Sequence, residues 1–417
     1  MLKDTNQNFW QLACIQASAM GLYVMLVGKQ IATTYGAGVA ITSICIGNLV
    51  LWIIGLSMFS MTYKGKGDAK HAIENVLSYL GRPIAFVAAL VVMVAFLSWF
   101  PTQINAQMDF TNELLAQVPG WTKTIRLIVS IVMAFIMIGV STLGIKAIKW
   151  ACTAIFPLLV LFTLYAVFNR TVPFSEIKWG VSIQGIILSI VIIFPGIINL
   201  PTFFRHARSK ADGIFALTLM TLFVIGFEIA TIWFQVAPNQ GGIFAPFSLS
   251  EGWTANLVIV LGFVALATFC VNIVNIYFAS AALEIVVPNI TDARGYALIG
   301  ILGILALNFF KSNALIGAIQ TVTNNFIGSL GIILVAGYLA RTIITHRHRI
   351  FEKQINIFCW AVGCVTSFVL YLLTREVVHS FTISIAAAVL TFLIIIFIEE
   401  TVWSVRRIPF SDKKIDH

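Results

Sequence analysis

Long uncharged apolar runs, separated by short loops that hold most of the charge, dominate the sequence. Residues 183–200 and 381–398 contain no charged side chain, and about 18 apolar residues suffice to cross the hydrocarbon of a bilayer as a helix. Strands of membrane barrels instead alternate polar and apolar positions. The pattern therefore predicts an all-α integral membrane protein.

The apolar pattern predicts about twelve transmembrane helices and no soluble domain, so that residues 1–417 form one polytopic membrane domain. The ninth segment is short, which favours a tilted or partly interfacial helix. The segments are 11–35, 39–63, 84–108, 125–145, 150–168, 183–204, 213–236, 255–283, 296–309, 315–340, 356–373 and 379–404.

Composition supports the membrane class and excludes several others. Hydrophobic residues make up 59% of the chain and charged residues 10%, whereas soluble domains are roughly a quarter charged. The net charge is +9, but the basic residues lie in short loops without interleaved aromatic residues, so no nucleic-acid partner is expected. The six cysteines lie in or beside apolar segments and form no CxxC or Cys/His cluster, so neither a zinc site nor a disulfide framework is expected.

The distribution of lysine and arginine predicts the orientation. If the N-terminus is cytoplasmic, most of the 26 basic residues fall in cytoplasmic loops, as the positive-inside rule requires. An even number of spans returns the C-terminus to the same side. We therefore expect a multi-pass protein of the cell (inner) membrane with both termini in the cytoplasm, whose first apolar segment is retained rather than cleaved as a signal peptide.

Two apolar segments contain helix-breaking runs near their middle. The first has a run of small residues from Ala17 to Gly21, and the sixth has Phe194, Pro195 and Gly196 in succession. Transporters commonly bind their substrate where corresponding helices of two inverted repeats are interrupted, although a proline kink with close helix packing is the alternative. The spacing of five segments predicts two repeats followed by two additional helices. These comprise 11–168, 183–340 and 356–404.

Polar side chains at helical spacing mark two further spans. Trp99 and Gln103 lie four residues apart in the third span, so that a ring able to stack and an amide able to hydrogen-bond share one face. Thr268, Asn272 and Asn275 form a similar stripe in the eighth span. An interfacial tryptophan and hydrogen bonding between helices are the structural alternatives.

Two ionisable residues lie within apolar spans. Glu228 is surrounded by apolar neighbours in the seventh span and is a candidate proton carrier, with pairing to a polar neighbour as the alternative. Lys29 lies in the outer part of the first span; its amine either snorkels to the outer surface, which we favour, or places a positive charge near the pathway. Asn48 in the second span is expected to be structural.

The segment 199–209, NLPTFFRHARS, resembles the N-x-P-D-[YF]-x-R-[YF]-[AG]-R signature of nucleobase–cation symporter family one, which includes cytosine, hydantoin and allantoin permeases. Ile46 to Leu49, the pair Trp99 and Gln103, and Ala279 with Ser280 also fit this family. The resemblance implies a LeuT-type fold of five-plus-five inverted repeats with two added helices. It also implies cation-coupled transport of a nucleobase-like ring.

In that family a tryptophan of the third helix stacks on the ring and a nearby glutamine hydrogen-bonds it; Trp99 and Gln103 match these positions. The resemblance places sodium ligands near Ala17, Gly21, Thr268, Val271 and Asn272. The chain departs from the pattern in having Thr202 in place of aspartate and Val271 in place of a hydroxyl residue. These departures weaken a sodium site and keep a proton carried by Glu228 as the alternative.

The predicted function is therefore a secondary active symporter that imports a nucleobase-like or related heterocycle by alternating access. An amino acid or amine transporter of the same architecture is the alternative. An enzyme is not expected, because no paired carboxylates or histidine cluster accompany the spans. No cofactor is predicted beyond Na⁺ or H⁺ as the coupling ion, and the oligomeric state is left open.

The predicted substrate-binding residues are Trp99, Gln103, Phe194, Gly196, Asn272 and Asn275. The predicted coupling residues are Ala17, Gly21, Thr268, Asn272 and Glu228.

Overall fold

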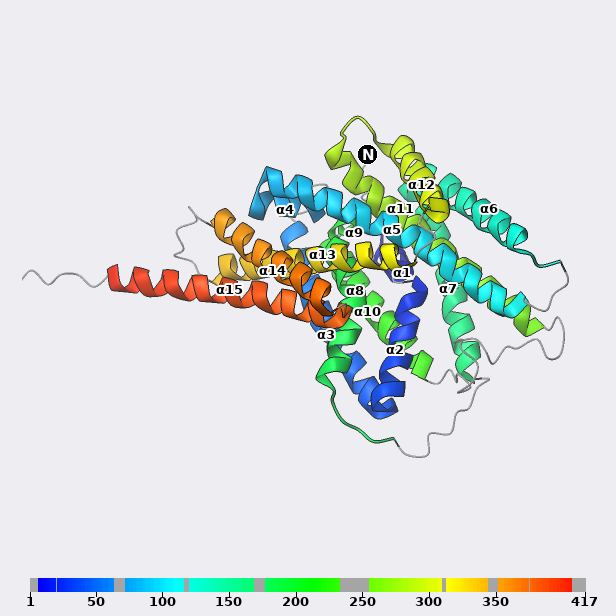
Figure 1. Cartoon of the computed structure of the whole chain (residues 1–417), viewed down its shortest axis with the longest axis horizontal. Helices are drawn as coiled ribbons and strands as arrows, with labels where there is room; N and C mark the ends of the chain where they lie inside the picture. Colours follow the sequence, from blue (N-terminus) through cyan, green and yellow to red (C-terminus); the bar gives the residue numbers. More distant parts are fainter. Residues whose placement is uncertain are drawn as a thin grey trace, which may run out of the picture.

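A computed structural model describes residues 7–19, 21–63, 72–115, 120–168, 177–232, 255–309, 313–343, 352–374 and 376–406. Within these ranges the chain forms fifteen helices (Figure 1). Their bounds are α1 Phe9–Ser18, α2 Gly21–Tyr35, α3 Ala37–Thr62, α4 Ala72–Leu80, α5 Arg82–Leu115, α6 Lys123–Thr142, α7 Ile145–Phe168, α8 Ile183–Asn199, α9 Pro201–Phe204, α10 Lys210–Ile232, α11 Ala255–Val286, α12 Asp292–Phe309, α13 Asn313–Ile343, α14 Glu352–Thr374 and α15 Val377–Arg406.

The predicted twelve apolar segments correspond to these helices. Among the described residues, ten helices are long and apolar enough to cross a membrane. The other two segments are the first, which is divided into α1 and α2, and the short ninth, which is α12. The all-helical membrane fold class predicted from the sequence is therefore confirmed, and the short helix α4 is an addition that hydropathy did not predict.

The first span breaks where the small residues predicted it. Helix α1 ends at Ser18, and α2 begins at Gly21. The amide of Ala19 still bonds to the carbonyl groups of Ile15 and Gln16, so α1 closes with a tight last turn. The chain then restarts as α2 with a glycine, which has no Cβ to restrict the change of direction.

The sixth span breaks later than the sequence predicted. Helix α8 continues through Pro195 to Asn199, and Pro201 then starts the short helix α9. Proline removes only its own backbone donor, so the helix survives past Pro195. The Asn199 side chain donates to the Pro195 carbonyl at 2.8 Å and so adds a hydrogen bond within the last turn of the helix. The break therefore follows Asn199 instead of coinciding with Gly196.

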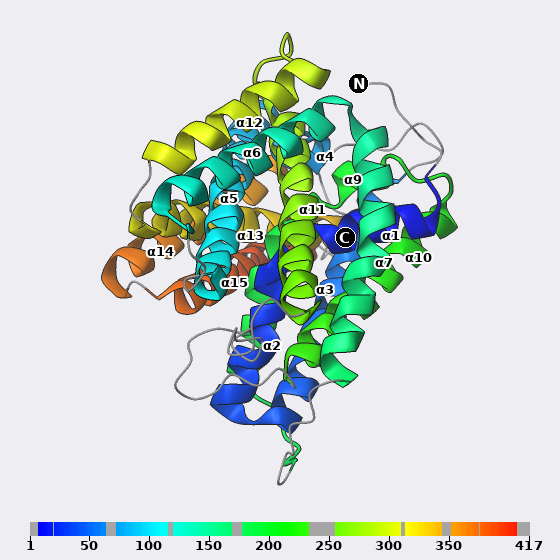
Figure 2. The same ribbon diagram turned by 90° about the vertical axis from the view of Figure 1, so that its right-hand side faces the viewer.

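The helices form a central group, with pairs of helices packed on either side of it. Figure 1 shows α14 and α15 together at one end of the molecule, with α6 and α12 toward the other. Figure 2, turned by 90°, shows α11 running through the middle in front of α1 and α2. Helix α11 contacts α1, α2, α5, α7 and α12. It therefore forms much of the wall against which the broken first span packs.

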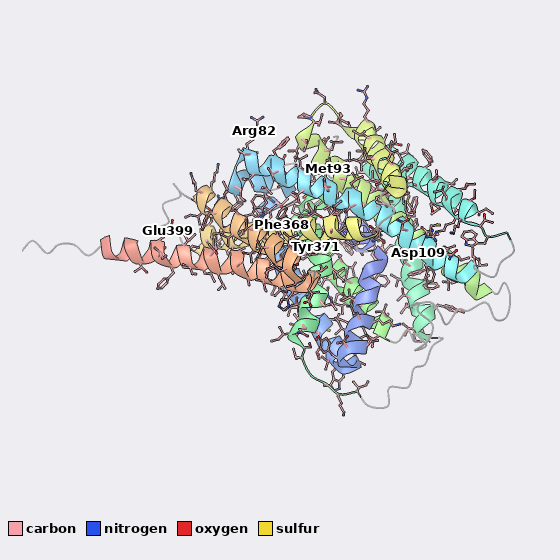
Figure 3. All side chains as sticks on the ribbon, in the orientation of Figure 1. Arg82, Met93, Asp109, Phe368, Tyr371 and Glu399 are labelled. Carbon is pink, nitrogen blue, oxygen red and sulfur yellow. The ribbon has the colours of Figure 1, made fainter. Side chains whose placement is uncertain are left out.

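The longest helix, α5, has charged residues near its two ends. Figure 3 shows Arg82 and Asp109 far apart along it, with Met93 between them. The rise of a helix places Arg82 and Asp109 about 40 Å apart, which exceeds the roughly 30 Å of bilayer hydrocarbon. Asp109 forms an ion pair with Arg126 of α6. The charges at each end of α5 therefore fit the water-facing boundaries of a span.

At another edge, a buried ion pair joins α4, α13 and α14. The guanidinium of Arg341 pairs with Glu352, whose side chain is 3% exposed, and its carbon lies 3.8 Å from the centre of the Tyr79 ring. Burial raises the pKa of Tyr79, and the positive charge of Arg341 opposes that rise. The unpredicted helix α4 is thus fixed to α13 and α14.

Candidate functional site

A cavity of about 60 Å³ lies where the break after α1 meets α5, α8, α11 and α13. Of the predicted substrate residues, Trp99, Gln103, Gly196 and Asn275 line it. Helices one, three, six and eight of the predicted order therefore meet as expected, and α13 is a contributor that the sequence did not indicate. The remaining lining residues are Ala19, Phe96, Ile192, Ile193, Pro195, Val271 and Asn324.

The polar lining of the cavity consists of amides and one indole. Gln103 is 3% exposed, and its side-chain oxygen has no hydrogen-bond partner among the described residues; the same is true of the buried side-chain oxygen of Asn324. Asn275 donates to the side-chain oxygen of Asn272 at 3.2 Å. No acidic or basic residue lines the cavity. Such a surface suits a neutral ligand that carries N–H groups.

Trp99 and Gln103 occupy the same face of α5, one turn apart, as their spacing predicted. Below them, Phe96 stacks on Phe278 of α11 with ring centres 4.6 Å apart. This contact joins the two helices that make the most extensive packing in the molecule. The aromatic face of the cavity is therefore supported by a rigid pair of helices.

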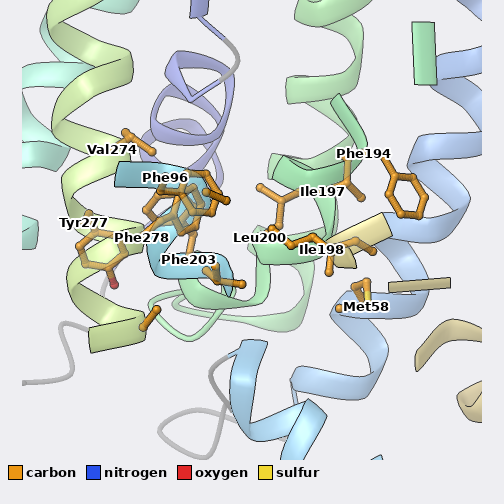
Figure 4. Packing of buried hydrophobic residues seen from close by; sticks show 14 of the residues in the cluster. Met58, Phe96, Phe194, Ile197, Ile198, Leu200, Phe203, Val274, Tyr277 and Phe278 are labelled. Atoms are coloured by element: carbon orange, nitrogen blue, oxygen red, sulfur yellow. The ribbon is translucent and has the colours of Figure 1, made fainter. Parts of the chain in front are cut away.

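Phe194 does not line the cavity, although it was predicted to bind substrate. Its ring is buried against Phe381 of α15, with ring centres 5.7 Å apart in an edge-to-face arrangement. Figure 4 shows Phe194 away from Phe96, toward Met58 of α3. Consecutive positions of a helix point about 100° apart, so Pro195 and Gly196 can face the cavity while Phe194 faces α15.

The predicted cation residues lie at the junction of α1, α2 and α11. Ala17 is buried in the last turn of α1, and Gly21 begins α2. Thr268 and Asn272 are fully buried on α11, which packs against both half-helices. The Thr268 hydroxyl has no hydrogen-bond partner in the described part of the chain. Ala17 and Gly21 thus flank the break, Thr268 and Asn272 lie buried on α11, and Val271 contributes an apolar surface to the cavity wall.

Gln16 is a polar residue at this junction that the sequence prediction missed. It lies in the last turn of α1, fully buried, and neither of its amide atoms has a partner among the described residues. An amide in the middle of an apolar run was a detectable signal.

Glu228 and Lys29 lie apart from the cavity lining. The Glu228 carboxyl is fully buried on α10 and accepts a hydrogen bond from the Asn48 amide of α3 at 2.6 Å. Asn48 therefore joins α3 to α10 through a hydrogen bond to Glu228, which is the structural role expected for it. The Lys29 amine is buried and has no hydrogen-bond partner in the part of the chain described. The preferred expectation that Lys29 snorkels to the surface was wrong, since the neighbouring helices enclose its amine.

The signature-like segment after α8 forms a cluster of buried polar contacts with Tyr277 of α11, called the seal below. The Tyr277 hydroxyl contacts the Arg205 guanidinium at 2.9 Å and the His206 ring at 2.8 Å, and lies 3.4 Å from the Thr202 carbonyl. Figure 4 shows Tyr277 beside Phe203, on which its ring stacks. Thr202 thus contributes its backbone carbonyl to this cluster. A threonine and an aspartate provide the same carbonyl, so the departure from the signature does not change this contact.

The N-terminal residues are tied to the same segment. Gln7 pairs with the backbone on either side of Ala207 in a short parallel bridge. Asp212 of α10 accepts a hydrogen bond from the amide of Phe9 at 3.0 Å and one from the Ser209 hydroxyl at 2.6 Å. A carboxylate at the first turn of α1 also favours the helix dipole. The end of α1 away from the break is therefore anchored to the start of α10.

A first span broken beside a cavity on which five helices converge, and a sixth span broken farther along the chain, characterise an all-α membrane protein of the LeuT-type fold. No protein-family model matches the sequence, and no curated protein is similar to it in sequence. Solved structures do resemble it. Mhp1, a nucleobase-cation-symport-1 family transporter in a closed conformation with bromovinylhydantoin bound, is 15% identical and has a TM-score of 0.71, covering 95% of this chain and 94% of that one.

Two further structures extend the comparison. A Na⁺-coupled sialic acid symporter in a substrate-bound outward-open state is 14% identical, with a TM-score of 0.68 over 94% of this chain and 89% of that one. The inward-facing conformation of Mhp1 gives a lower TM-score of 0.63 at 16% identity, over 94% and 91% of the two chains.

Proposed function

We propose that the chain is a cation-coupled symporter that moves a small neutral heterocycle, of the size and polarity of a nucleobase, by alternating access. The observation that carries the proposal is the cavity at the helix break, lined by Trp99 and three amides and by no charged residue. The likeness to Mhp1 and to a Na⁺-coupled symporter supports it. Both of those proteins are transporters rather than enzymes.

Each polar lining residue has a role in this proposal. The Trp99 indole stacks on the ring of the solute, while Gln103, Asn275 and Asn324 donate to and accept from its edge. Gly196 lets the solute approach the backbone of α8, because glycine has no side chain there. Asn272 holds Asn275 in position through their hydrogen bond.

The size of the cavity implies movement during transport. Its volume of about 60 Å³ is small beside the roughly 300 Å³ at the lower end of typical ligand pockets. A ring compound therefore enters only after the helices around the break separate. Movement of that kind, alternately toward each side of the membrane, is what alternating access requires.

The proposed architecture follows the predicted repeats, 11–168 and 183–340, with 356–404 as additional helices. We place both termini in the cytoplasm and the protein in the cell (inner) membrane, on the distribution of basic residues. A coupling cation near the break would meet the Thr268 hydroxyl and the side chain of Asn272. Backbone carbonyl groups near Ala17 and Gly21 would complete that set.

A ligand-stability screen tests the substrate class. Purified protein is heated with nucleobases and hydantoins in one arm and with amino acids and amines in the other, with and without sodium and at two pH values. A neutral lining favours the first arm, whereas an amino acid carboxylate would bind at the N-terminal end of α2, near Gly21. Stabilisation by amino acids alone would refute the heterocycle assignment.

Uptake by protein in liposomes then tests the site. Trp99→Ala and Gln103→Ala should each abolish accumulation of the stabilising compound, while Trp150→Ala, which removes an indole that is 66% exposed on α7, should leave it unchanged. If both cavity variants accumulate the compound as well as the wild type, the cavity is not the transport site.

A further inference from the structure

The Glu228 side chain occupies an unusual position, about one turn before the end of α10 at Ile232. It is fully buried, and α10 packs against α1, α2, α3 and α7 on its sides. No ion pair within the described ranges includes Glu228. Enclosing an unpaired carboxylate in protein costs several kcal/mol by a rough estimate. The carboxyl is therefore expected to hold a proton unless a cation approaches it.

Within the described residues, the Glu228 carboxyl has one hydrogen-bond donor, Asn48. The Asn48 amide nitrogen lies 2.6 Å from Oε2 of Glu228, 3.0 Å from the carbonyl oxygen of Ile44 and 3.5 Å from the hydroxyl of Ser189. Oε1 of Glu228 is buried and has no partner among the described residues. An ionised carboxylate accepts at both oxygens, so one amide donor leaves half of that capacity unused.

Asn48 has two N–H groups for these three acceptors. A carboxylate attracts an N–H donor about twice as strongly as a neutral oxygen does. Deprotonation therefore holds the Asn48 amide at Glu228 and weakens its contact with Ser189, and protonation releases it toward Ser189. The protonation state of Glu228 on α10 therefore changes the strength of the contact between Asn48 and Ser189 of α8.

The position of Ser189 makes this contact relevant to the cavity. Ser189 lies one helical turn before Ile193, which lines the cavity, and Pro195 and Gly196 follow on the same helix. Helices α3 and α8 approach closely at this level, since a Cβ on Gly47 would lie 2.5 Å from the Ser189 hydroxyl. A small shift of Asn48 and Ser189 is thus transmitted to the cavity wall without intervening flexible side chains.

Few other titratable groups face this position. Helix α3 contributes Cys45, which interacts electrostatically with Glu228. Helix α2 contributes Lys29, whose amine forms no ion pair within the described ranges. Cys14 of α1 and Cys152 of α7 interact with each other. No basic residue therefore replaces the proton as the partner of Glu228.

We propose that Glu228 and Asn48 form a buried proton-binding site that is linked through Ser189 to the substrate cavity. One proton from water forms one O–H bond with the carboxylate, and the same bond breaks when the proton leaves; no other bond changes. The first half of the proposal, the proton site, is independent of the transported compound. The second half, coupling to uptake, rests on the function proposed above.

Infrared spectroscopy of the protein in lipid vesicles tests the proton site. The wild type at neutral pH should show the carbonyl stretch of a protonated carboxylic acid, and Glu228→Gln should lose it. Glu376→Gln, which alters an exposed acid, should retain the band. The site is refuted if the band is absent from the wild type or persists in Glu228→Gln.

Isotope labelling keeps this test decisive if Glu228→Gln does not fold. Wild-type protein labelled with ¹³C at glutamate carboxyl groups should show the same band at lower frequency, and unlabelled protein should not. In unlabelled protein, Asn48→Leu should move the band to higher frequency, because it removes the one donor to Oε2. A band that does not respond to glutamate labelling would refute the assignment to an acid of this type.

Uptake into vesicles tests the coupling separately. With the compound found in the stability screen, an inward pH gradient should drive accumulation in the wild type and in Glu376→Gln. Glu228→Gln should lose this accumulation and retain exchange of compound across the membrane. Accumulation that persists in Glu228→Gln would refute the coupling. If the screen finds no compound, the proposed function fails, and the infrared result still decides the proton site.

Discussion

Replacing Gly28 of α2 by alanine should destabilise the protein, because α2 and α10 touch there through their backbones. A Cβ built on Gly28 would lie 1.8 Å from the carbonyl oxygen of Glu228 and 2.7 Å from the hydroxyl of Thr231. Real Cβ atoms do not approach other atoms within 3.0 Å, so the contact is 1.2 Å too short. The Glu228 carbonyl belongs to a helix backbone and cannot rotate away as a side chain would.

The cost follows from two opposing terms. Forcing an extra methyl group into a packed interior typically costs about 1–3 kcal/mol, and a contact with rigid backbone belongs at the upper end. Alanine gains roughly 0.5–1 kcal/mol over glycine within a helix. Gly28→Ala should therefore lower the stability of the protein by about 2 kcal/mol, with α2 displaced from α10.

Thermal unfolding in one detergent, followed by tryptophan fluorescence, measures this effect against a matched control. Gly226 lies on α10 itself, and a Cβ there meets no atom within 4 Å. Gly226→Ala should melt at or slightly above the wild-type temperature, because it gains helix propensity without a clash. A Gly28→Ala protein that melts as high as Gly226→Ala would refute the close approach of α2 and α10.

Three further predictions concern other buried contacts. Arg341→Ala leaves Glu352 buried without its partner, so the protein should lose about 3–5 kcal/mol of stability; adding Glu352→Gln should recover part of the loss, and no recovery would contradict the ion pair. Tyr277→Phe removes the hydroxyl that contacts Arg205 and His206, so its melting temperature should fall, and an unchanged value would contradict the seal. Asn275→Ala should weaken binding of the stabilising compound by a few-fold to tenfold, the equivalent of roughly one hydrogen bond; unchanged affinity in a titration would place the compound elsewhere.

Much of the site was predictable because its signals are local. The pair Trp99 and Gln103 could be placed on one face from its spacing, and both residues line the cavity. The small-residue run from Ala17 to Gly21 predicted the break in the first span, since such residues favour a change of direction. By contrast, the amide of Asn324 did not identify a cavity residue by itself, because an amide in an apolar helix can equally bond to a neighbouring helix.

Orientation around a helix axis was harder to predict than position along it. Phe194 is adjacent to the cavity-lining Pro195 in sequence, yet its ring packs on Phe381 of α15. Helices in a membrane are apolar on faces toward lipid and toward protein alike, so hydrophobicity does not distinguish the two. The break in the sixth span was predicted at Phe194, Pro195 and Gly196 for a different reason, because proline and glycine there do not end the helix, which continues to Asn199.

The sequence by itself determined that the chain is an all-helical membrane protein, how many apolar segments it has and where the first of them is interrupted. These properties depend on hydrocarbon length and on backbone chemistry at individual positions. Only the tertiary structure decided which polar side chains meet. Asn48 and Glu228 are 180 residues apart and come within 2.6 Å, because a buried carboxyl in an apolar interior needs a hydrogen-bond donor and the packing of α3 against α10 supplies one.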